Sequence, residues 1–396
     1  MREVVIVDGV RSAFGRRGGG LHRFAASELG GVVAKALLDK TKLMERGGHL
    51  DDFMMGSVVP DQKSLSPARY AAQVAGIPYD TSCTFIEMQC GSAINAMNHA
   101  AWKILMGQSD VAIVGGAESH SQWLDRFMVS EDPNADLPYI PIDFKAAPWP
   151  EQATNMLQNS DRMAREWNIS RRECDEFAYR SQHLMGEAIA KGIIGPEIVP
   201  CIDPVTGGVI DKDEHPRPNI TLEKIEGMQP VYEGGVTTAA NASGRNDGAA
   251  FVMMMTAEKA KELGYTPIMK WVTGADTGCL PNIMGLAAAY SNMKAMKQAG
   301  LKIKDIDIFE CNEAFASQNL CVIKEMQETM GEKIDMSKWN PYGGAIAVGH
   351  PNAASGARIT LFAARRFAED GGKYAVVSSC CGGGLGTTAI FENLLK

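Results

Sequence analysis

The sequence predicts an α/β protein in which layers of helices alternate with layers of strands. Apolar runs of strand length, such as Val4–Val7 and Val111–Val114, alternate with segments of helical period, such as Ala26–Leu38. The chain also has 396 residues, whereas a single hydrophobic core rarely grows beyond about 250–300 residues. We therefore expect two or three domains that together contain several packed layers.

Residues 1–119 are expected to form one α/β unit. Short apolar or β-branched runs indicate strands, whereas apolar residues that recur every three or four positions indicate helices. Strands are expected at 4–7, 53–59 and 111–114, and helices at 26–38, 67–75 and 91–106.

Residues 120–246 have a different composition and are expected to be an insertion. They are richer in Pro, Asp, Asn and Arg, and they contain an amphipathic helical pattern at 171–191.

Strand and helix patterns resume after this insertion. Strands are expected at 249–255, 268–272, 307–310, 374–379 and 388–391, and helices at 284–299, 313–328 and 353–367. We assign residues from about 247 to 267 to the first unit and 268–396 to a second one.

Two stretches suggest that the second unit repeats the first. In both, a short strand pattern runs into a cysteine-glycine stretch: FIEMQ-CGS at 85–92 and YAVVSS-CCGGG at 374–384. No repeat of individual residues accompanies this similarity. An internal duplication is therefore a hypothesis that rests on these two stretches.

Composition and charge argue against several classes of function. The net charge of −8 makes nucleic acid and anionic membranes unexpected partners. The nine cysteines include no Cys-x-x-Cys pair, so neither a disulfide framework nor a zinc site is expected. The amino-terminal apolar run is too short for a signal peptide, and no stretch has the roughly 20 apolar residues of a membrane span. We expect a soluble, cytoplasmic protein without a metal.

Cys90 is the first candidate functional residue. It stands between a strand pattern and a helix pattern in FIEMQCGSAINAM, and Gly91 follows it. The N–H groups at a helix start favour a nearby anion, which predicts a lowered pKa for the Cys90 thiol. Gly91 would let a carbonyl group approach closely. On this stretch alone, a buried structural cysteine is the alternative.

Three further stretches carry reactive or polar groups. Cys380 and Cys381 precede a glycine run, which could form either an anion-binding nest of N–H groups or a tight turn between strands. His350 stands in a loop between glycine and proline, where it either points into a site or is exposed and inert. Asn312 stands at a predicted helix start after a strand, with helix capping as the alternative role.

Taken together, the four stretches resemble the thiolase family, the CoA-dependent Claisen enzymes that make or cleave 3-oxoacyl-CoA thioesters. The resemblance covers almost the whole chain. Its motifs are VVIVDGVRSAFGRRGG at 4–19, SPAR at 66–69, GGAESHS at 115–121, ISRRECDEFAYRSQ at 169–182, DEHPRP at 213–218, NASGRNDGAA at 241–250, NEAF at 312–315 and GGAIAVGHP at 343–351. It implies two similar βαβαβ-type halves in five layers with an inserted loop domain, a dimer or tetramer, and CoA as co-substrate with no tightly bound cofactor.

The resemblance also implies roles for the reactive residues. Cys90 would be the nucleophile that accepts the acyl group. Cys380, aligned through Cys-x-Gly-Gly-Gly, would be the acid/base, and Cys381 would be the spacer. His350 would activate Cys90 and help to bind the thioester oxygen, and Asn312 would hold a water in the same oxyanion hole.

A second oxyanion hole and the substrate contacts complete the implied site. Backbone N–H groups of Cys90 and Gly382 would form the second hole. The implied substrate contacts are Ser243 on the pantetheine path, Arg217 at the nucleotide end, Met156 on the tunnel wall, and Met284 and Phe315 beside the acyl pocket. This set is what the chemistry requires, because a Claisen reaction needs a nucleophile, a base for the α-proton and donors for the enolate.

The sequence departs from the family pattern near the substrate. Ala93 replaces glycine, Tyr342 replaces a small or polar residue, and Asn352 begins Asn-Ala-Ala-Ser-Gly where Leu-Gly-Ala-Ser-Gly is usual. Residues 284–290 lack the usual Gly-Pro-x-Pro, and MLQNSD at 156–161 replaces Met-Gly-x-Thr-Ala-Glu. We infer a standard reaction on an acyl chain whose length the sequence does not specify.

Two alternatives remain, a related enzyme and a protein of a different functional class. A related condensing enzyme, such as a ketoacyl synthase or hydroxymethylglutaryl-CoA synthase, would lack the cysteine at position 380. A catalytically silent acyl-CoA-binding scaffold, which would need a partner protein, is disfavoured by the presence of Cys90, His350, Asn312 and Cys380. A CoA-dependent thiolysis assay separates the enzyme from the scaffold.

Overall fold

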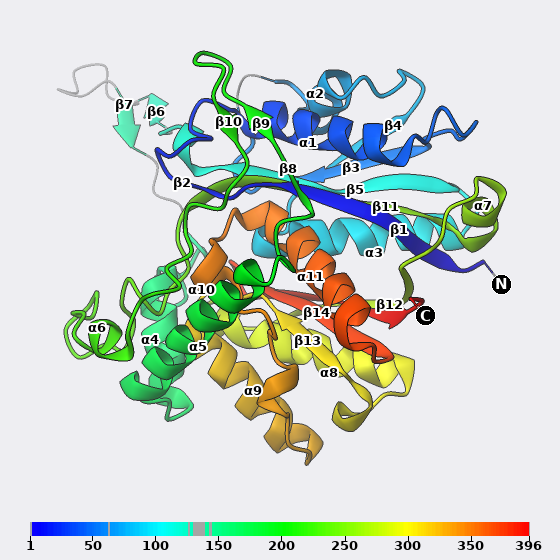
Figure 1. Cartoon of the computed structure of the whole chain (residues 1–396). Coiled ribbons are helices and arrows are strands. Elements are labelled where there is room, and N and C mark those ends of the chain that lie inside the picture. The colour runs from blue at the N-terminus through cyan, green and yellow to red at the C-terminus, as the bar shows by residue number, and fades with distance from the viewer. Residues whose placement is uncertain (1, 62–63, 126, 130–138, 142–144, 396) are drawn as a thin grey trace.

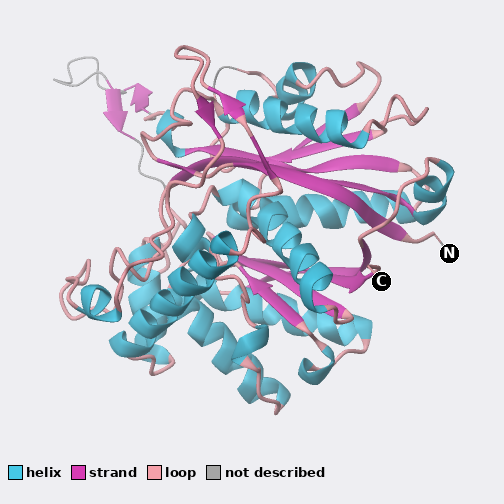
Figure 2. Ribbon diagram, viewed as in Figure 1, coloured by secondary structure: helices cyan, strands magenta, loops and turns pink. Residues whose placement is uncertain are grey.

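The computed structural model describes residues 2–61, 64–125, 127–129, 139–141 and 145–395. Its elements stack in five layers in the order helices, sheet, helices, sheet, helices (Figure 1). The two sheets face each other across a central helical layer (Figure 2). The predicted fold class is therefore confirmed.

The first half contains a mixed sheet in the order β4-β3-β5-β11-β1. Its strands are β1 (Val4–Ser12), β3 (Asp52–Gly56), β4 (Ser82–Ile86), β5 (Val111–Ser119) and β11 (Asn246–Thr256). β3 pairs in parallel with β4 and β5, whereas β11 pairs antiparallel with β5 and β1. Two-residue strands extend this sheet, because β2 (Gly15–Arg16) pairs with β11 and β8 (Ile198–Val199) with β1.

The second half repeats the strand order of the first. Its strands are β12 (Met269–Gly278), β13 (Ile308–Cys311), β14 (Tyr374–Cys381) and β15 (Leu385–Asn393). The order β13-β14-β15-β12, with one parallel and two antiparallel pairings, matches β3-β5-β11-β1. The two halves are thus similar in topology, as the resemblance implied.

The two cysteine-glycine stretches, however, do not correspond to each other. Cys90 follows β4 and precedes the central helix of the first half, whereas Cys380 and Cys381 end β14 and lead through glycines into β15. The counterpart of the β14–β15 turn is the connection from β5 to β11. The proposed correspondence of these two stretches is therefore wrong. The duplication itself is visible in the strand order of the two halves.

The sheets of the two halves join at one corner. Residues 4–6 of β1 pair antiparallel with residues 269–271 of β12, which links the described strands of both halves into one continuous 11-stranded sheet. Away from this corner the sheets diverge, and helices fill the space between them (Figure 2).

Helices cover both sheets and separate them. The outer helices of the first half are α1 (Ala26–Thr41) and α2 (Pro67–Val74), the central ones are α3 (Ser92–Leu105) and α11 (Ser355–Asp370), and the outer ones of the second half are α8 (Ala287–Ala299) and α9 (Ala316–Met330). α3 is buried on most of its surface, as expected for a helix between two sheets. A Cβ atom on Gly356 would stand 2.7 Å from the Ile94 side chain, so this glycine lets α11 approach α3 closely.

The segment between β5 and β11 lies beside the layers. It contains β6 (Phe127–Val129), β7 (Tyr139–Pro141), α4 (Met156–Glu166), α5 (Arg171–Ala190), β9 (Cys201–Ile202), β10 (Val209–Ile210) and α6 (Leu222–Glu226). The predicted insertion at 120–246 includes residues 126, 130–138 and 142–144, which lie outside the described residues. The domain boundaries at 119, 246 and 267 stay predictions.

Short elements make up the remaining connections. They are α7 (Ala257–Glu262), α10 (Ala345–Val348) and the 3₁₀ turns η1 (Gln89–Gly91), η2 (His120–Gln122), η3 (Pro281–Leu286), η4 (Ile303–Asp305), η5 (Met336–Lys338) and η6 (Asn352–Ala354). The turns η1 and η6 lead directly into α3 and α11, so each central helix begins with a tight turn.

Most predicted elements differ from the observed ones by a few residues at their ends, and for two of them specific contacts give the reason. β3 ends at Gly56 instead of continuing to residue 59, because the N–H groups of Val58 and Val59 donate to the Glu118 carboxylate instead of to a neighbouring strand. The helix predicted from residue 313 begins at Ala316, since Phe315 has extended backbone and pairs with Ala242.

Candidate active site

Cys90 lies in a tight turn that hydrogen bonds hold in place. Gln89, just before it, has a left-handed backbone with φ of 50°. The Glu87 carboxylate accepts from the Gln89 N–H at 2.7 Å. The Ser92 hydroxyl donates to the Gln89 carbonyl at 2.7 Å and accepts from the Met88 N–H at 3.0 Å. These contacts fix the cysteine at the start of the central helix α3.

The thiol of Cys90 is protonated at neutral pH. Burial of the sulfur raises the pKa of Cys90 to about 11, and the carboxylates of Glu118 and Glu87 raise it further. The prediction of a lowered pKa at the helix start is therefore wrong, because loss of water around the sulfur outweighs the N–H groups of the turn. A group that removes the proton is needed before the sulfur can attack.

His350 lies at the start of the other central helix, in the loop before η6. Its N–H donates to Asn246 Oδ1 at 2.9 Å, its Nδ1 lies 2.6 Å from Ser355 Oγ, and its Nε2 lies 3.3 Å from Asn312 Nδ2. Burial lowers the pKa of His350 to about 3, so the ring is neutral at pH 7. His350 is 5% exposed, and the alternative of an exposed, inert histidine is wrong.

Gly349 permits this placement of His350. Its φ of 102° lies in the region that favours glycine, and a Cβ atom there would stand 2.6 Å from the Asn246 side chain. Any other residue would displace the hydrogen bond that holds the histidine backbone.

Asn312 reaches the same centre from the end of β13. Its backbone N–H donates to the Ser378 carbonyl on β14 at 2.9 Å, and its side chain contacts His350. Asn312 does not cap α9, which Phe315 precedes, so the capping alternative is wrong. Among the described residues, Asn312 Oδ1 is buried without a hydrogen-bond partner, which leaves an acceptor for a water or a substrate group.

Cys380 and Cys381 bring two more sulfur atoms near Cys90. Both are buried, and burial is the largest cause that raises the pKa of each thiol, followed by the charge of Cys90. The Cys381 sulfur lies 2.6 Å from the position that a Cβ atom on Gly91 would occupy. The turn of Cys90 and the end of β14 are thus packed against each other.

The glycine run forms the tight turn between antiparallel strands that was one of its two interpretations. Cys380 pairs with Gly386, and Gly383 and Gly384 have φ of 83° and 85°. A Cβ atom on Gly382 would stand 2.9 Å from Met156 Cε and 3.1 Å from Gln89 Oε1. Gly382 therefore lies between the turn of Cys90 and the start of α4.

The residues expected to contact substrate occupy two regions. Met284 and Phe315 are buried in the same hydrophobic cluster. Ser243 lies beside them, since its N–H donates to the Ala314 carbonyl at 3.0 Å. Arg217 lies on an exposed loop and donates its N–H to Gln182 at 2.7 Å; among the described residues, no hydrogen bond or ion pair connects it to the cysteines.

Three polar residues near Cys90 were not predicted as site residues. Asn352 Nδ2 donates to the Cys90 sulfur at 3.2 Å, and Asn352 Oδ1 accepts from His120 Nε2. Glu118 accepts from Val58 at 3.0 Å. The sequence does carry a signal, since Asn352 stands where the family pattern has leucine, but a change at this position by itself indicates only an altered substrate wall.

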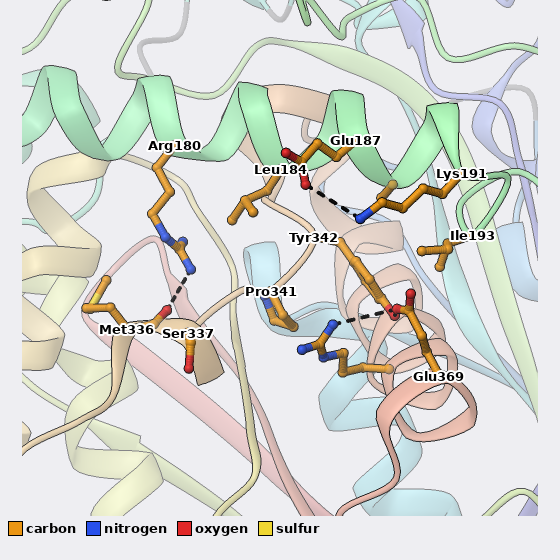
Figure 3. Close-up of a pocket in the computed structure, with 12 residues that line it drawn as sticks. Arg180, Leu184, Glu187, Lys191, Ile193, Met336, Ser337, Pro341, Tyr342 and Glu369 are labelled. Carbon is orange, nitrogen blue, oxygen red and sulfur yellow. Dashed lines mark hydrogen bonds and ion pairs between the residues drawn. The ribbon is translucent and has the colours of Figure 1, made fainter.

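A separate cavity of about 360 Å³ lies between α5, α11 and residues 336–342 (Figure 3). Two of its three cations are ion-paired, since Lys191 lies 3.7 Å from Glu187 and Arg366 lies 3.6 Å from Glu369. Arg180 donates to two backbone carbonyls, and its Nη1 is buried without a hydrogen-bond partner among the described residues.

Two kinds of feature are absent from the described residues. No helix among them is long and apolar enough to cross a membrane. No group of three or more His, Cys, Asp or Glu side chains in this part of the chain is arranged to hold a metal ion.

Two layered α/β halves of matching strand order, in which the turn of Cys90 contacts the turn that follows His350, define the class of fold. Comparison with known proteins identifies the class more closely. The family model described as thiolase, N-terminal domain, matches residues 4–258, and the one described as thiolase, C-terminal domain, matches residues 265–393.

Individual relatives agree with the family models. The chain is 35% identical to a 3-ketoacyl-CoA thiolase of Bacillus subtilis, over 99% of this chain and 100% of the relative. It superposes on the crystal structure of a Bacillus anthracis acetyl-CoA acetyltransferase with a TM-score of 0.91, at 32% identity over 99% of both chains. It also superposes on human mitochondrial 3-ketoacyl-CoA thiolase in complex with CoA, with a TM-score of 0.89, 33% identity and coverage of 99% of this chain and 98% of that one. The chain belongs to the thiolase family, and the predicted acyltransferase class is confirmed.

Proposed function

We propose that the protein catalyses reversible thiolysis of 3-oxoacyl-CoA to acyl-CoA and acetyl-CoA through an acyl group carried on Cys90. The observation that carries this proposal is that the turn of Cys90 contacts the turn that follows His350, with Cys380 near enough to interact electrostatically with Cys90. This set supplies the nucleophile, the second acid/base and the polar groups that a Claisen reaction requires.

The first half-reaction forms the acyl-enzyme. His350 accepts the Cys90 proton, and the thiolate attacks the 3-oxo carbon of the substrate. The bond between C2 and C3 breaks, and the carbanion of acetyl-CoA takes a proton from Cys380. The high pKa of Cys90 fits this order, because the thiol is protonated in the free protein and must pass its proton to His350 before the sulfur attacks.

The second half-reaction releases the acyl group. The Cys380 thiolate takes the proton of a new CoA thiol, whose sulfur attacks the carbonyl carbon of the acyl-enzyme. The bond to the Cys90 sulfur breaks, and Cys90 recovers its proton from His350. Asn312 holds a water that faces the substrate oxygen in one oxyanion hole, and the N–H groups of Cys90 and Gly382 form the other.

CoA is the co-substrate in this proposal, and no other cofactor is required. Ser243 lies on the pantetheine path, Met156 forms a wall of the tunnel, and Arg217 contacts the nucleotide end. Met284 and Phe315 border the acyl pocket; their burial in one cluster next to Ser243 supports that role. A similar solved structure contains CoA, which supports binding of this ligand.

The cellular setting belongs to the same proposal. We infer a cytoplasmic homodimer or homotetramer that acts in fatty acid metabolism, by β-oxidation. The names of the 3-ketoacyl-CoA thiolases among its relatives support that pathway.

A thiolysis assay tests the proposed function. Purified protein is mixed with CoA and a series of 3-oxoacyl-CoAs that begins with acetoacetyl-CoA, and loss of the Mg²⁺-enolate absorbance is followed. We expect CoA-dependent cleavage of at least one chain length with ping-pong kinetics. Inactivity across the series, with folded protein, would favour the catalytically silent scaffold.

A further inference from the structure

The Cys90 sulfur receives a hydrogen bond from a side chain that has no assigned role. Asn352 Nδ2 lies 3.2 Å from Cys90 Sγ. Asn352 is the first residue of η6, the turn that precedes the central helix α11. The described hydrogen bonds of the His350 ring run instead to Ser355 and Asn312. Asn352 is thus placed to act on the nucleophile directly.

His120 fixes which end of the Asn352 amide faces the sulfur. His120 is 5% exposed, its Nε2 contacts Asn352 Oδ1, and its Nδ1 has no partner among the described residues. A proton on Nδ1 would be a buried donor without an acceptor, which is costly, so the neutral ring carries its proton on Nε2 and donates it to the Asn352 side chain. The Asn352 oxygen therefore points to His120, and its NH₂ group points to Cys90.

The surroundings of His120 keep it a neutral donor. Burial is the main cause that lowers the pKa of His120 to about 4, and the charges of Arg245 and Arg17 lower it further. Its ring stacks on Trp123 with centroids 4.0 Å apart. The donor at Nε2 is therefore present throughout the neutral pH range, and the ring has little freedom to turn.

A third residue holds the turn that carries Asn352. The Ala353 N–H donates to Glu118 Oε2 at 3.3 Å, and the same carboxylate accepts from Val58 and Val59 at 3.0 and 3.3 Å. Glu118 lies near the end of β5, two residues before His120 in the sequence. The end of β5 and the turn η2 that follows it thus anchor η6 and orient Asn352.

We propose that Asn352 is a catalytic residue whose NH₂ group stabilises the negative charge on the Cys90 sulfur, and that His120 is a positioning residue that orients this amide. The proposal deepens the proposed function, because it rests on Cys90 as the nucleophile. The charge is present on the sulfur when Cys90 has lost its proton and again when the acyl group leaves it.

The expected size of the effect follows from the chemistry of the bond. A hydrogen bond to an ionised group stabilises the charged form. For an acid such as a thiol, this typically lowers the pKa by about one to two pH units. Asn352 is the larger of two hydrogen-bond donors that lower the pKa of the Cys90 thiol, the other being the backbone of Cys90 itself. The charges of Glu118 and Glu87 act in the opposite direction, and Cys380 and Cys381 are neutral thiols. Loss of the Asn352 donor should therefore be measurable as a slower reaction of the thiol.

The experiment measures alkylation of Cys90 in the free enzyme. Iodoacetamide reacts with the thiolate, so the rate at fixed pH reports the thiolate fraction. Rates between pH 7 and 10.5 are read from the peptide that contains Cys90 by mass spectrometry, and the half-exposed Cys83 on β4 serves as an internal control. Thermal unfolding and circular dichroism establish that each variant is folded.

Two variants of Asn352 test the donor. Asn352→Leu removes it and restores the residue usual in the family pattern, whereas Asn352→Asp keeps the shape but replaces the donor by an acceptor. We expect alkylation of Cys90 at pH 8 to slow about 10- to 100-fold in Asn352→Leu and further in Asn352→Asp, with Cys83 unchanged. Alkylation of Cys90 at the wild-type rate in a folded Asn352→Leu protein overturns the proposal.

Two variants of His120 test the positioning role. His120→Phe keeps a ring to stack on Trp123 but has no donor, whereas His120→Gln keeps an N–H donor. We expect slow alkylation in His120→Phe and recovery in His120→Gln. His120→Phe should add nothing in the Asn352→Leu background, because the histidine acts through the amide; an additive effect overturns its role.

This test is independent of the proposed function. Alkylation needs no CoA, no substrate and no turnover, so it gives its answer even if the enzyme cleaves none of the 3-oxoacyl-CoAs. If Cys90→Ser still became acylated, the proposed function would fail, whereas the alkylation rates would still report whether Asn352 stabilises the Cys90 thiolate. The catalytic part of the proposal is checked by kcat, which should fall with the alkylation rate.

Discussion

Replacement of Gly91 by alanine tests how closely the nucleophile and the β14–β15 turn are packed. A Cβ atom at this position would stand 2.5 Å from Thr387 Cγ2 and 2.6 Å from Cys381 Sγ. Carbon atoms in contact normally stand about 3.5–4.0 Å apart, so the turn of Cys90 or the strands must move by about 1 Å. Overpacking of this kind costs about 1–3 kcal/mol of stability, and a 1 Å displacement of reacting groups can slow a reaction about 10²-fold.

The assay for Gly91→Ala combines kinetics with unfolding. We expect kcat for thiolysis to fall about 10²-fold and the unfolding midpoint to fall with it. Gly208→Ala is the control, since the nearest atom to its Cβ position is the flexible Thr206 hydroxyl at 3.3 Å. Addition of Cys381→Ala and Thr387→Ser to Gly91→Ala should restore part of the loss. Unchanged kcat and midpoint in Gly91→Ala would refute the packing described for this site.

The other predictions concern individual groups. Asn312→Ala should lower kcat by about 10²–10³-fold with a smaller change in KM, because it removes support for an oxyanion hole; a change in KM alone would refute that role. Cys380→Ser should still become acylated but fail to exchange the α-protons of acetyl-CoA, measured by NMR in ²H₂O, whereas Cys381→Ser should exchange them; the reverse pattern would make Cys381 the base. The slope of the free energy of unfolding against pH, from urea titrations between about pH 4 and 6.5, tests the burial of His350. Burial lowers the pKa of His350 to about 3, so this side chain binds a proton in the unfolded chain but not in the folded one over this range, which makes stability fall with falling pH; the raised pKa values of Glu118 and Glu310, about 7 and about 8, act in the opposite direction in both proteins. In His350→Asn the slope should be smaller by up to about 1.4 kcal/mol per pH unit, and an unchanged slope would show that the histidine is not buried as described.

The fold was predictable from the sequence because local patterns repeat along the chain. Alternating apolar runs and helical periods indicated the α/β class, and the motifs around Cys90, Asn312, His350 and Cys380 identified the family. These motifs are short and carry their own backbone requirements, such as the glycine before His350 with φ of 102°. Such requirements are visible in a single stretch of sequence.

The rest depended on contacts between distant segments. Val58 and Val59 do not continue β3, because their N–H groups donate to the Glu118 carboxylate. The high pKa of Cys90 is caused mainly by burial of its sulfur. Asn352 was noticed as an unusual residue, but its partner His120 lies 232 positions away. The role of such a pair depends on the orientation of its side chains, which no local pattern specifies.

The repeat of the two halves also explains where the reactive groups lie. Cys90 and His350 precede the corresponding helices α3 and α11, each through a 3₁₀ turn. Because both central helices start at the same end of the molecule's middle layer, their turns η1 and η6 are in contact. A topological repeat thus brings two different chemical groups to one place.

The most direct test of this account is to locate the acyl group on the protein. The enzyme is incubated with ¹⁴C-labelled acetyl-CoA, quenched in acid and digested, and the labelled peptide is identified by mass spectrometry. We predict one label per chain, on the peptide that contains Cys90, and no label in Cys90→Ser. Label on the peptide that contains Cys380 and Cys381, or label that persists in Cys90→Ser, would contradict the assignment of the nucleophile.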